Sequence, residues 1–412
     1  MTDSTAQMGA ASATHDVKYE RKAVSLMAIG FGIVGLDRFI INPLFPTMQQ
    51  DLGLSYQDLG IISAVFALTW GLSSIFSGGL ADRIGRKRVI IPSVLFFSIL
   101  VATTGLAAGL VSLLIVRAVM GLAEGAYVPS SIVTTVEASH PKRIGLNVGI
   151  QQMAAPLIGL GLGPLIAVAL LDVLPSWHWV FAVAAIPGLI IAVIMMKVLR
   201  PDTPAPMPQG VKREARFGPV LKNRNVIFIT ASMCCYLATL ITLSAFMPSY
   251  LTDHLGFGPI DMGKVLAGIG LGSFIGMVAL PALSDKVGRK PVIVVALLIE
   301  FVALWFLGGI GADVGALFAV LFVATFMNAG VVAISVGPLT SGSVSPALTA
   351  TATGLVVGIG EIVGGALAPA LAGGLADTMG ITVIIKIGLI AIGIAIPLVL
   401  FGLRDVKLKT TH

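Results

Sequence analysis

The sequence contains few charged residues and almost no cysteine. Asp, Glu, Lys and Arg make up only 11% of its 412 residues, whereas hydrophobic residues make up 56%. A soluble domain carries about 25% charged residues, so this deficit excludes an ordinary soluble protein and indicates one that lives in lipid. The two cysteines, Cys234 and Cys235, are neighbours in an apolar run. They therefore provide neither a disulfide framework nor a four-ligand metal site.

Motifs for metal, nucleotide and hydrolytic chemistry are also missing. None of the five histidines has metal-ligand spacing with another, and the sequence contains neither H-E-x-x-H nor G-x-S-x-G. Residues 258–265, GPIDMGKV, have the spacing of a phosphate-binding loop, but Val265 stands where that loop needs Ser or Thr. We therefore expect no enzymatic activity, no cofactor, no metal and no use of ATP.

Long apolar runs recur along the chain. Each is close to the about 20 residues that a membrane-spanning helix needs, and we count twelve of them. The sequence therefore predicts an all-α membrane protein. The predicted spans are 23–46, 58–81, 88–109, 112–136, 144–171, 177–199, 224–252, 260–283, 289–311, 314–342, 349–374 and 380–403.

The positions of Lys and Arg predict how these spans are oriented. Basic residues concentrate in cytoplasmic loops, and with the N-terminus inside, 22 of the 26 Lys and Arg residues lie in or beside cytoplasmic segments. Both termini are therefore predicted to be cytoplasmic, as tails at 1–22 and 404–412. The net charge of +6 follows from this orientation and needs no nucleic-acid partner. The absence of an Asn-x-Ser/Thr sequon favours a bacterial cytoplasmic membrane.

The two halves of the chain repeat one loop. GGLADRIGRKRVI at 78–90 ends the second predicted span, and PALSDKVGRKPVI at 281–293 ends the eighth. A repeat of this length indicates two six-helix bundles related about an axis along the membrane normal. The basic, proline-rich stretch 200–223 is typical of a linker, which places the bundles at 23–199 and 224–403.

These features resemble the major facilitator superfamily over essentially the whole chain. The resemblance implies that family's fold and a cytoplasmic latch, in which Asp82 faces the N-terminus of a neighbouring helix whose dipole favours a carboxylate. The alternative is that the loops only anchor the chain through their positive charge. In the second copy Pro281 replaces the first glycine. The matching residues are Gly78, Asp82, Arg83, Gly85, Arg86 and Lys87 in the first copy and Asp285, Gly288 and Arg289 in the second.

Six ionisable side chains lie well inside predicted spans. Each costs about 2.5–3.5 kcal/mol at a helix centre, so such residues usually face a cavity and have a function. A purely structural ion pair is the alternative for Asp37 and Arg38. Glu300 lies in a span that the resemblance makes peripheral, and we interpret it as protonated and packed. The six are Asp37, Arg38, Arg117, Glu124, Glu300 and Glu361.

Two short segments resemble a narrower family. GLDR in span one and GLAEGAYVP in span four resemble the anion:cation symporters, which take up organic carboxylates with protons. The resemblance implies that Arg38 binds the substrate carboxylate while Asp37 and Glu124 exchange protons. Arg117 lies on the same helix face as Glu124 and is grouped with proton coupling. FIINPLFP, after Arg38, departs from the family's more polar continuation. The chemistry of arginine agrees with the role implied for Arg38, because its guanidinium group stays charged and offers a carboxylate a planar, two-point contact.

Three further polar residues are candidates for substrate binding. Gln151 and Gln152 in span five could donate hydrogen bonds to substrate, or they are simply the polar start of that helix. Glu361 in span eleven stands where the symporter family often has Asn, so it implies either a second protonation site or a different substrate. Small-residue spacings around Glu361 predict tight helix packing.

The sequence thus predicts a secondary active transporter in the cytoplasmic membrane that imports a small organic anion, such as a sugar acid or aromatic acid, with protons. The alternative is a proton-coupled exporter of drugs or metabolites. Residues 159–167, GLGLGPLIA, supply part of an exporter motif in Gly159, Gly163 and Pro164. An exporter of lipophilic cations would gain little from Arg38, whereas an importer of organic anions uses it.

Overall fold

The computed structural model describes residues 15–200, 217–345 and 348–404, without the side chains of Gly78, Gly79, Asp82, Arg83, Phe217 and Ala350. Within these ranges the chain forms helices and no strand. Twelve helical segments there are long and apolar enough to cross a membrane, which confirms the predicted number. The all-α fold is also confirmed.

Twelve spans are built from these helices, several of which are broken. The first six spans contain α1 (Val17–Phe39), α2 (Ile41–Leu52), α3 (Tyr56–Ile84), α4 (Lys87–Thr104), α5 (Leu110–Ala138), the short η1 (Pro141–Arg143), α6 (Ile144–Ala155), the π-helical η2 (Pro156–Leu162), α7 (Gly163–Val173) and α8 (Trp177–Val198). The last six contain α10 (Arg224–Ser249), η3 (Tyr250–His254), α11 (Pro259–Val287), α12 (Arg289–Leu307), α13 (Val314–Ile334), η4 (Ser335–Leu339), α14 (Thr340–Ser343), α15 (Thr349–Gly360), η6 (Glu361–Leu367), α16 (Ala368–Met379), α17 (Val383–Pro397) and η7 (Leu398–Gly402). The short α9 (Phe217–Leu221) precedes them.

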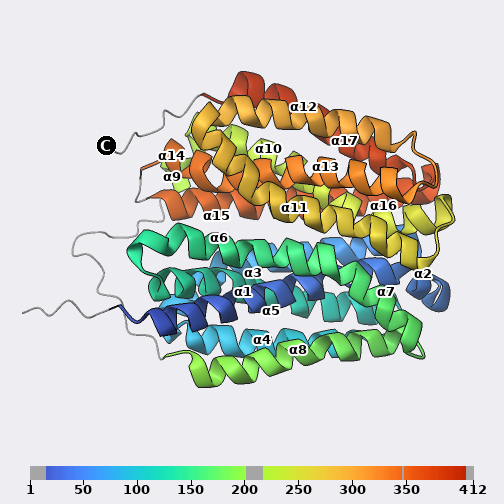
Figure 1. Ribbon diagram of the computed structural model, residues 1–412, viewed down its shortest axis with the longest axis horizontal. Helices are drawn as coiled ribbons and strands as arrows, with labels where there is room; N and C mark the ends of the chain where they lie inside the picture. The colour runs from blue at the N-terminus through green and yellow to red at the C-terminus, as the bar shows by residue number, and fades with distance from the viewer. Residues whose placement is uncertain (1–14, 201–216, 346–347, 405–412) are drawn as a thin grey trace, which may run out of the picture.

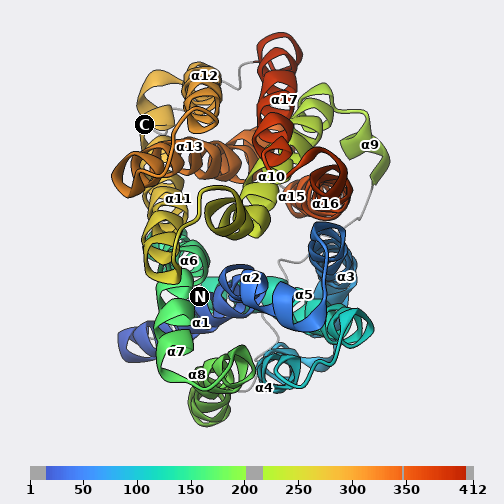
Figure 2. The same ribbon diagram turned by 90° about the vertical axis from the view of Figure 1, so that its right-hand side faces the viewer.

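The helices form two bundles of six spans that pack side by side. Figure 2 shows α1 to α8 in one group and α10 to α17 in the other, with α3 beside α16 and α2 beside α10. We call the side where α1 begins and η7 ends the terminal face, and the side where α2 and α16 end the opposite face (Figure 1). The long helices run between these two faces.

The first span is longer than predicted at both ends. It runs from Val17 to Leu52, although the prediction placed it at 23–46 and gave residues up to 22 to a tail. The Asp16 carboxylate accepts the Tyr19 N–H at 3.0 Å and so caps α1. This hydrogen bond lowers the pKa of Asp16. Long polar side chains in the end turns can reach out toward water, so hydropathy alone ended the helix too early.

The predicted linker and tails lie largely outside the described residues. This applies to 201–216 of the linker, to 1–14 and to 405–412. Within the predicted linker, α9 is helical.

Candidate functional site

The break in the first span places Asp37 and Arg38. The helix α1 ends at Phe39 and α2 begins at Ile41, near the middle of the span. Pro43 has no N–H to continue the hydrogen-bond ladder across this point. Both charged side chains therefore stand at a helix discontinuity inside the membrane region.

Arg38 forms an ion pair with Glu361 across the two bundles. One guanidinium nitrogen lies 2.9 Å from Glu361 Oε2, and the other donates to Oε1 at 3.4 Å. Both side chains are largely buried. Glu361 begins the π-helical turn η6, and π-turns inside α-helices often mark functional sites. A Cβ at Gly365 would lie 2.6 Å from Glu361 Oε2, so the glycine leaves room for the carboxylate.

Aromatic rings surround the Arg38 guanidinium. Its central carbon lies 5.3 Å from the ring centre of Phe39, 5.4 Å from that of Phe66 and 5.6 Å from that of Trp70. Rings at this distance attract a cation through their faces. They also restrict water, which strengthens any ionic contact made inside the enclosure.

Asp37, Arg117 and Glu124 form a buried cluster beside this pair. Their side chains are at most 2% exposed. Arg117 donates to the backbone carbonyl oxygens of Asp37 at 3.2 Å and Arg38 at 3.4 Å. Both carboxyl groups lack a hydrogen-bond partner among the described residues, although Glu124 lies within electrostatic range of Asp37, Arg38 and Arg117. Such buried, unpartnered carboxyl groups are strong candidates for carrying protons.

A small cavity opens between the bundles next to Arg38. Its volume is about 30 Å³, which admits water but no organic acid. Two guanidinium groups border it, one from each of two helices. The lining residues are Arg38, Phe39, Ile41, Asn42, Ile62, Ser63, Phe66, Arg117, Ile241 and Ala245. A larger ligand therefore needs the bundles to separate.

The two glutamines of span five have different surroundings. Gln151 is fully buried, accepts a hydrogen bond from Thr135 and donates one to Ser131 at 2.8 Å. Its amide thus joins α6 to α5. Gln152 is partly exposed, and its Oε1 has no partner among the described residues, which leaves it the freer of the two to contact a ligand.

Basic residues of the repeated loops contact helix ends of their own bundles. Gly85 and Gly288 have φ of 98° and 109°, a conformation that favours glycine. Arg86 pairs with Glu137, and Lys87 donates to the Met196 carbonyl. In the second copy Arg289 donates to the Pro338 carbonyl at 2.6 Å and Lys290 to that of Leu403 at 2.9 Å. Each basic pair therefore ties neighbouring helix ends together.

The carboxylates of the two loops are Asp82 and Asp285. Gly78, Asp82 and Arg83 lie in α3, but their side chains are outside the described set. Asp285 is exposed at the end of α11. The latch contact expected for Asp82 therefore stays a prediction.

Sequence analysis missed a carboxylate that joins the bundles at the opposite face. Asp377, near the end of α16, accepts the N–H groups of Tyr56 at 3.0 Å and Gln57 at 2.9 Å at the start of α3. The Tyr56 hydroxyl also donates to Asp253 at 2.7 Å. A signal was available, because GGLAD occurs at 78–82 and again at 373–377. Glycine follows three residues later in both, and Gly380 also has a positive φ.

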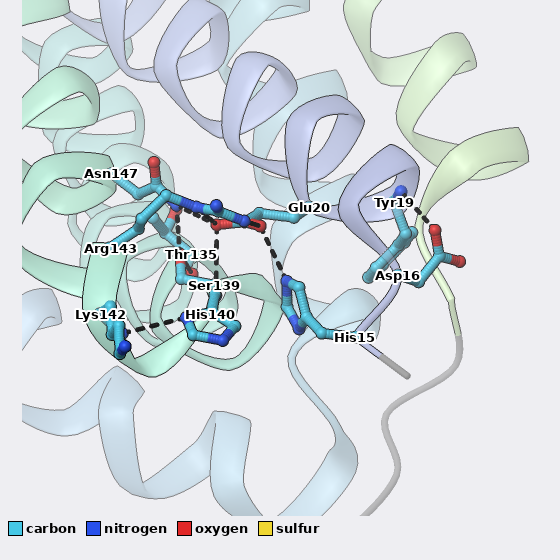
Figure 3. A network of polar contacts seen from close by, with 10 residues as sticks. All are labelled: His15, Asp16, Tyr19, Glu20, Thr135, Ser139, His140, Lys142, Arg143 and Asn147. Atoms are coloured by element: carbon cyan, nitrogen blue, oxygen red, sulfur yellow. Dashed lines mark hydrogen bonds and ion pairs between the residues drawn. The ribbon is translucent and has the colours of Figure 1, made fainter. Parts of the chain in front are cut away.

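A second missed network lies at the terminal face. The buried Glu20 carboxylate accepts hydrogen bonds from Asn147 at 2.7 Å and from Arg143, and His15 lies 2.7 Å away. Figure 3 shows these side chains converging on Glu20. The contacts hold the start of α1 against α6 and the loop before it. They lie within the first bundle.

Glu300 lies apart from this site, in the second bundle. Its Oε1 accepts a hydrogen bond from Asn328 at 2.7 Å, and Asn328 also donates to the Tyr236 carbonyl at 3.2 Å. The Glu300 side chain is buried between α12, α13 and α10. Glu300 is therefore a buried membrane carboxyl group whose hydrogen-bond partner is Asn328 and not Arg38.

Comparisons with known proteins agree with this architecture. The chain is 28% identical to the hexuronate transporter of Bacillus subtilis, over 71% of this chain and 73% of that protein. It is 25% identical to the sialic acid transporter NanX of Escherichia coli, over 76% of this chain and 77% of that protein. The crystal structure of a bacterial homologue of the human lysosomal transporter Spinster superposes with a TM-score of 0.77 at 18% identity, covering 94% and 97% of the two chains.

The family assignment rests on a longer match. Residues 27–369 match the family model of the Major Facilitator Superfamily. The resemblance noted from the repeated loop is thereby confirmed. The protein is a member of the major facilitator superfamily, a multi-pass transporter of the inner membrane rather than an enzyme.

Proposed function

We propose that this protein imports a small organic carboxylate together with protons by alternating access. The observation that carries the proposal is the Arg38 guanidinium, held near mid-span among aromatic rings and already paired with a carboxylate. An Arg in such a place suits an anionic substrate. The names of the two relatives, which specify hexuronate and sialic acid, support the same substrate class.

The roles within the site follow from their surroundings. Arg38 binds the substrate carboxylate, and Asp37 and Glu124 carry the protons, because both carboxyl groups are buried and without a hydrogen-bond partner among the described residues. Arg117 holds the break in span one through two backbone carbonyls and keeps positive charge beside both acids. We assign Gln152 to the substrate because its Oε1 has no partner among the described residues, whereas Gln151 joins α6 to α5.

The direction of opening follows from the contacts between bundles. In our proposal the terminal face is cytoplasmic, in agreement with the distribution of Lys and Arg. Asn42 donates to the Ser244 carbonyl at 2.9 Å, and Asp377 binds the start of α3, so the opposite face is closed. The protein is therefore closed on the side that we propose to be the outside. Separation of these contacts would expose the site to that side.

One of the glycines that suggested an exporter, Gly159, has a packing role. A Cβ at Gly159 would lie 2.4 Å from the backbone of Gly35, so this glycine permits close contact between spans one and five. No export chemistry is needed to explain it.

A flux assay tests the proposed function. Purified protein is placed in liposomes that contain a pH-sensitive dye, and D-glucuronate, N-acetylneuraminate, benzoate, tartrate or tetraphenylphosphonium is added outside. We expect the lumen to acidify with one class of carboxylate. Asp37→Asn should abolish this proton influx, whereas the control Glu300→Gln should keep it. Proton release from acid-loaded liposomes driven only by the cation would contradict import and favour an exporter.

A further inference from the structure

The Arg38 fork is occupied by a carboxylate of the protein itself. Glu361 receives both guanidinium donors, at 2.9 and 3.4 Å, which is the two-point contact that a substrate carboxylate would use. The rings of Phe39, Phe66 and Trp70 flank the same guanidinium. A substrate cannot make this contact while Glu361 holds it.

We propose that Glu361 is an internal stand-in for the substrate carboxylate, which the substrate displaces and which then takes up a proton. The proposal rests on the proposed function, since it requires that Arg38 bind a carboxylate. The exchange moves one ion pair and forms one O–H bond. Arg38 leaves the Glu361 carboxylate for that of the substrate, and a proton from water binds a Glu361 oxygen.

The charge balance of this exchange favours it in a membrane. Before the exchange the site holds one guanidinium and one carboxylate, and afterwards it holds one guanidinium, the substrate carboxylate and a neutral Glu361. The net charge of the site does not change. Without the proton, a carboxylate would remain alone near mid-membrane, at a cost of about 2.5–3.5 kcal/mol on insertion scales.

The neighbours of Glu361 offer no second cation among the described residues. From α3, Gly71 packs against the Glu361 side chain and Ala67 packs beside Gly365, and neither carries charge. From α10 the titratable neighbour is Cys234, whose thiol lies 3.9 Å from the Ile359 carbonyl. Arg38 is therefore the cation that pairs with Glu361 among the described residues, and its transfer to a substrate leaves the Glu361 carboxyl group without a cationic partner.

The same exchange also couples binding to movement. Arg38 belongs to the first bundle and Glu361 to the second, so their ion pair holds the bundles together at the level of the site. Replacement of Glu361 by a substrate breaks this link. The displacement of Glu361 by the substrate then causes both proton uptake by Glu361 and separation of the two bundles.

Proton counting tests the inference. Binding of D-glucuronate to the detergent-purified full-length protein is measured by calorimetry at pH 6, 7 and 8, in buffers with different ionisation heats. We expect Glu361→Gln to bind the sugar acid more tightly at pH 8 than the wild type, to take up about one proton fewer per bound substrate, and to lower the slope of log Kd against pH by about one. Glu361→Ala should behave in the same way, which guards against an effect of the Gln amide.

The controls separate this inference from the proposed function. Glu300→Gln removes another buried carboxyl and should leave proton uptake and the pH slope as in the wild type. If Glu361→Gln and Glu361→Ala bind D-glucuronate with the wild-type proton number, the stand-in role is wrong while carboxylate binding stands. If the wild type binds neither D-glucuronate nor the other carboxylates of the flux panel, the proposed function is wrong and this inference falls with it.

Discussion

Arg38 is the residue on which anion recognition depends. Arg38→Lys keeps the positive charge but replaces a planar two-point fork by a single ammonium group. We expect the affinity for the transported carboxylate to fall about tenfold, because one charged hydrogen bond contributes about 1.5 kcal/mol. Equilibrium binding of the purified protein measures this change.

A surface substitution of the same type provides the control. Arg200 pairs with Asp16 at the terminal face, and both side chains are exposed. Arg200→Lys should leave carboxylate affinity unchanged. Equal affinity in Arg38→Lys and the wild type would show that Arg38 does not contact the substrate.

At this scale the sequence predicted which residues to examine but not how they pair. The six mid-span charges could be recognised because each is costly in lipid. The Arg38 to Glu361 contact joins residues 323 positions apart and depends on the π-turn that begins at Glu361, which no periodicity predicts. The two hydrogen bonds that the Gln151 amide makes with Thr135 and Ser131 likewise depend on how α5 and α6 pack.

Among the elements, α3 and α16 illustrate what a span pattern can and cannot predict. Their existence followed from hydropathy, whereas their mutual contact followed from small residues and one carboxylate. A Cβ at Gly373 would lie 2.4 Å from the Tyr56 carbonyl oxygen, so glycine lets α16 approach the start of α3. Asp377 then reaches two free N–H groups of that helix, where the helix dipole favours negative charge.

Asp377→Asn should weaken closure of the opposite face. The amide keeps one acceptor but loses the charge and the second acceptor, so we expect a loss of about 1 kcal/mol and an approximately fivefold shift toward the state open at that face. The measurement is the rate at which an impermeant maleimide added at the opposite face labels Ser63→Cys, a cavity-lining position, in a Cys234→Ser, Cys235→Ser background.

Asp58→Asn is the matched control for this change. Asp58 caps the same end of α3, but its partner is Ser55 of the same segment. Loss of the Asp58 carboxylate should disturb the start of α3 without changing the rate at which Ser63→Cys is labelled. An identical rate in Asp377→Asn and its parent protein would mean that the Asp377 contact does not govern closure.

For the whole molecule, one place of close backbone contact between the two bundles is a pair of glycines. A Cβ at Gly270 of α11 would lie 1.9 Å from the Gly161 nitrogen of η2, so a methyl group there forces the backbones apart. Overpacking of this kind costs about 1–3 kcal/mol. Gly270→Ala should therefore disfavour the arrangement that is closed at the opposite face and raise the same labelling rate by about fivefold or more.

Gly263→Ala provides the comparison on the same helix. Gly263 also faces span five, but an added Cβ would lie 3.4 Å or more from its neighbours, which is ordinary contact. Its labelling rate should remain that of the parent. If Gly270→Ala also labels at the parental rate, the glycine contact does not determine the separation of the bundles.

The whole fold was the most predictable level. Twelve apolar runs, the repeated loop and the distribution of basic residues each constrain a helical bundle in a membrane, because lipid leaves the backbone few alternatives. The helix breaks were harder to predict, since Pro43 and the π-turns interrupt the ladder without changing hydropathy. The site depends on those breaks, so it was only partly predictable.

The ion pair between Arg38 and Glu361 also bears on chloride, the small anion that every transporter of carboxylates meets. An unpaired guanidinium at mid-membrane would bind chloride, and the transporter could then carry chloride across the membrane in place of an organic anion. Chloride is a single sphere and cannot match the two-oxygen contact that Glu361 already makes with Arg38. The internal carboxylate therefore acts as a filter, and only an anion able to outcompete a carboxylate gains entry.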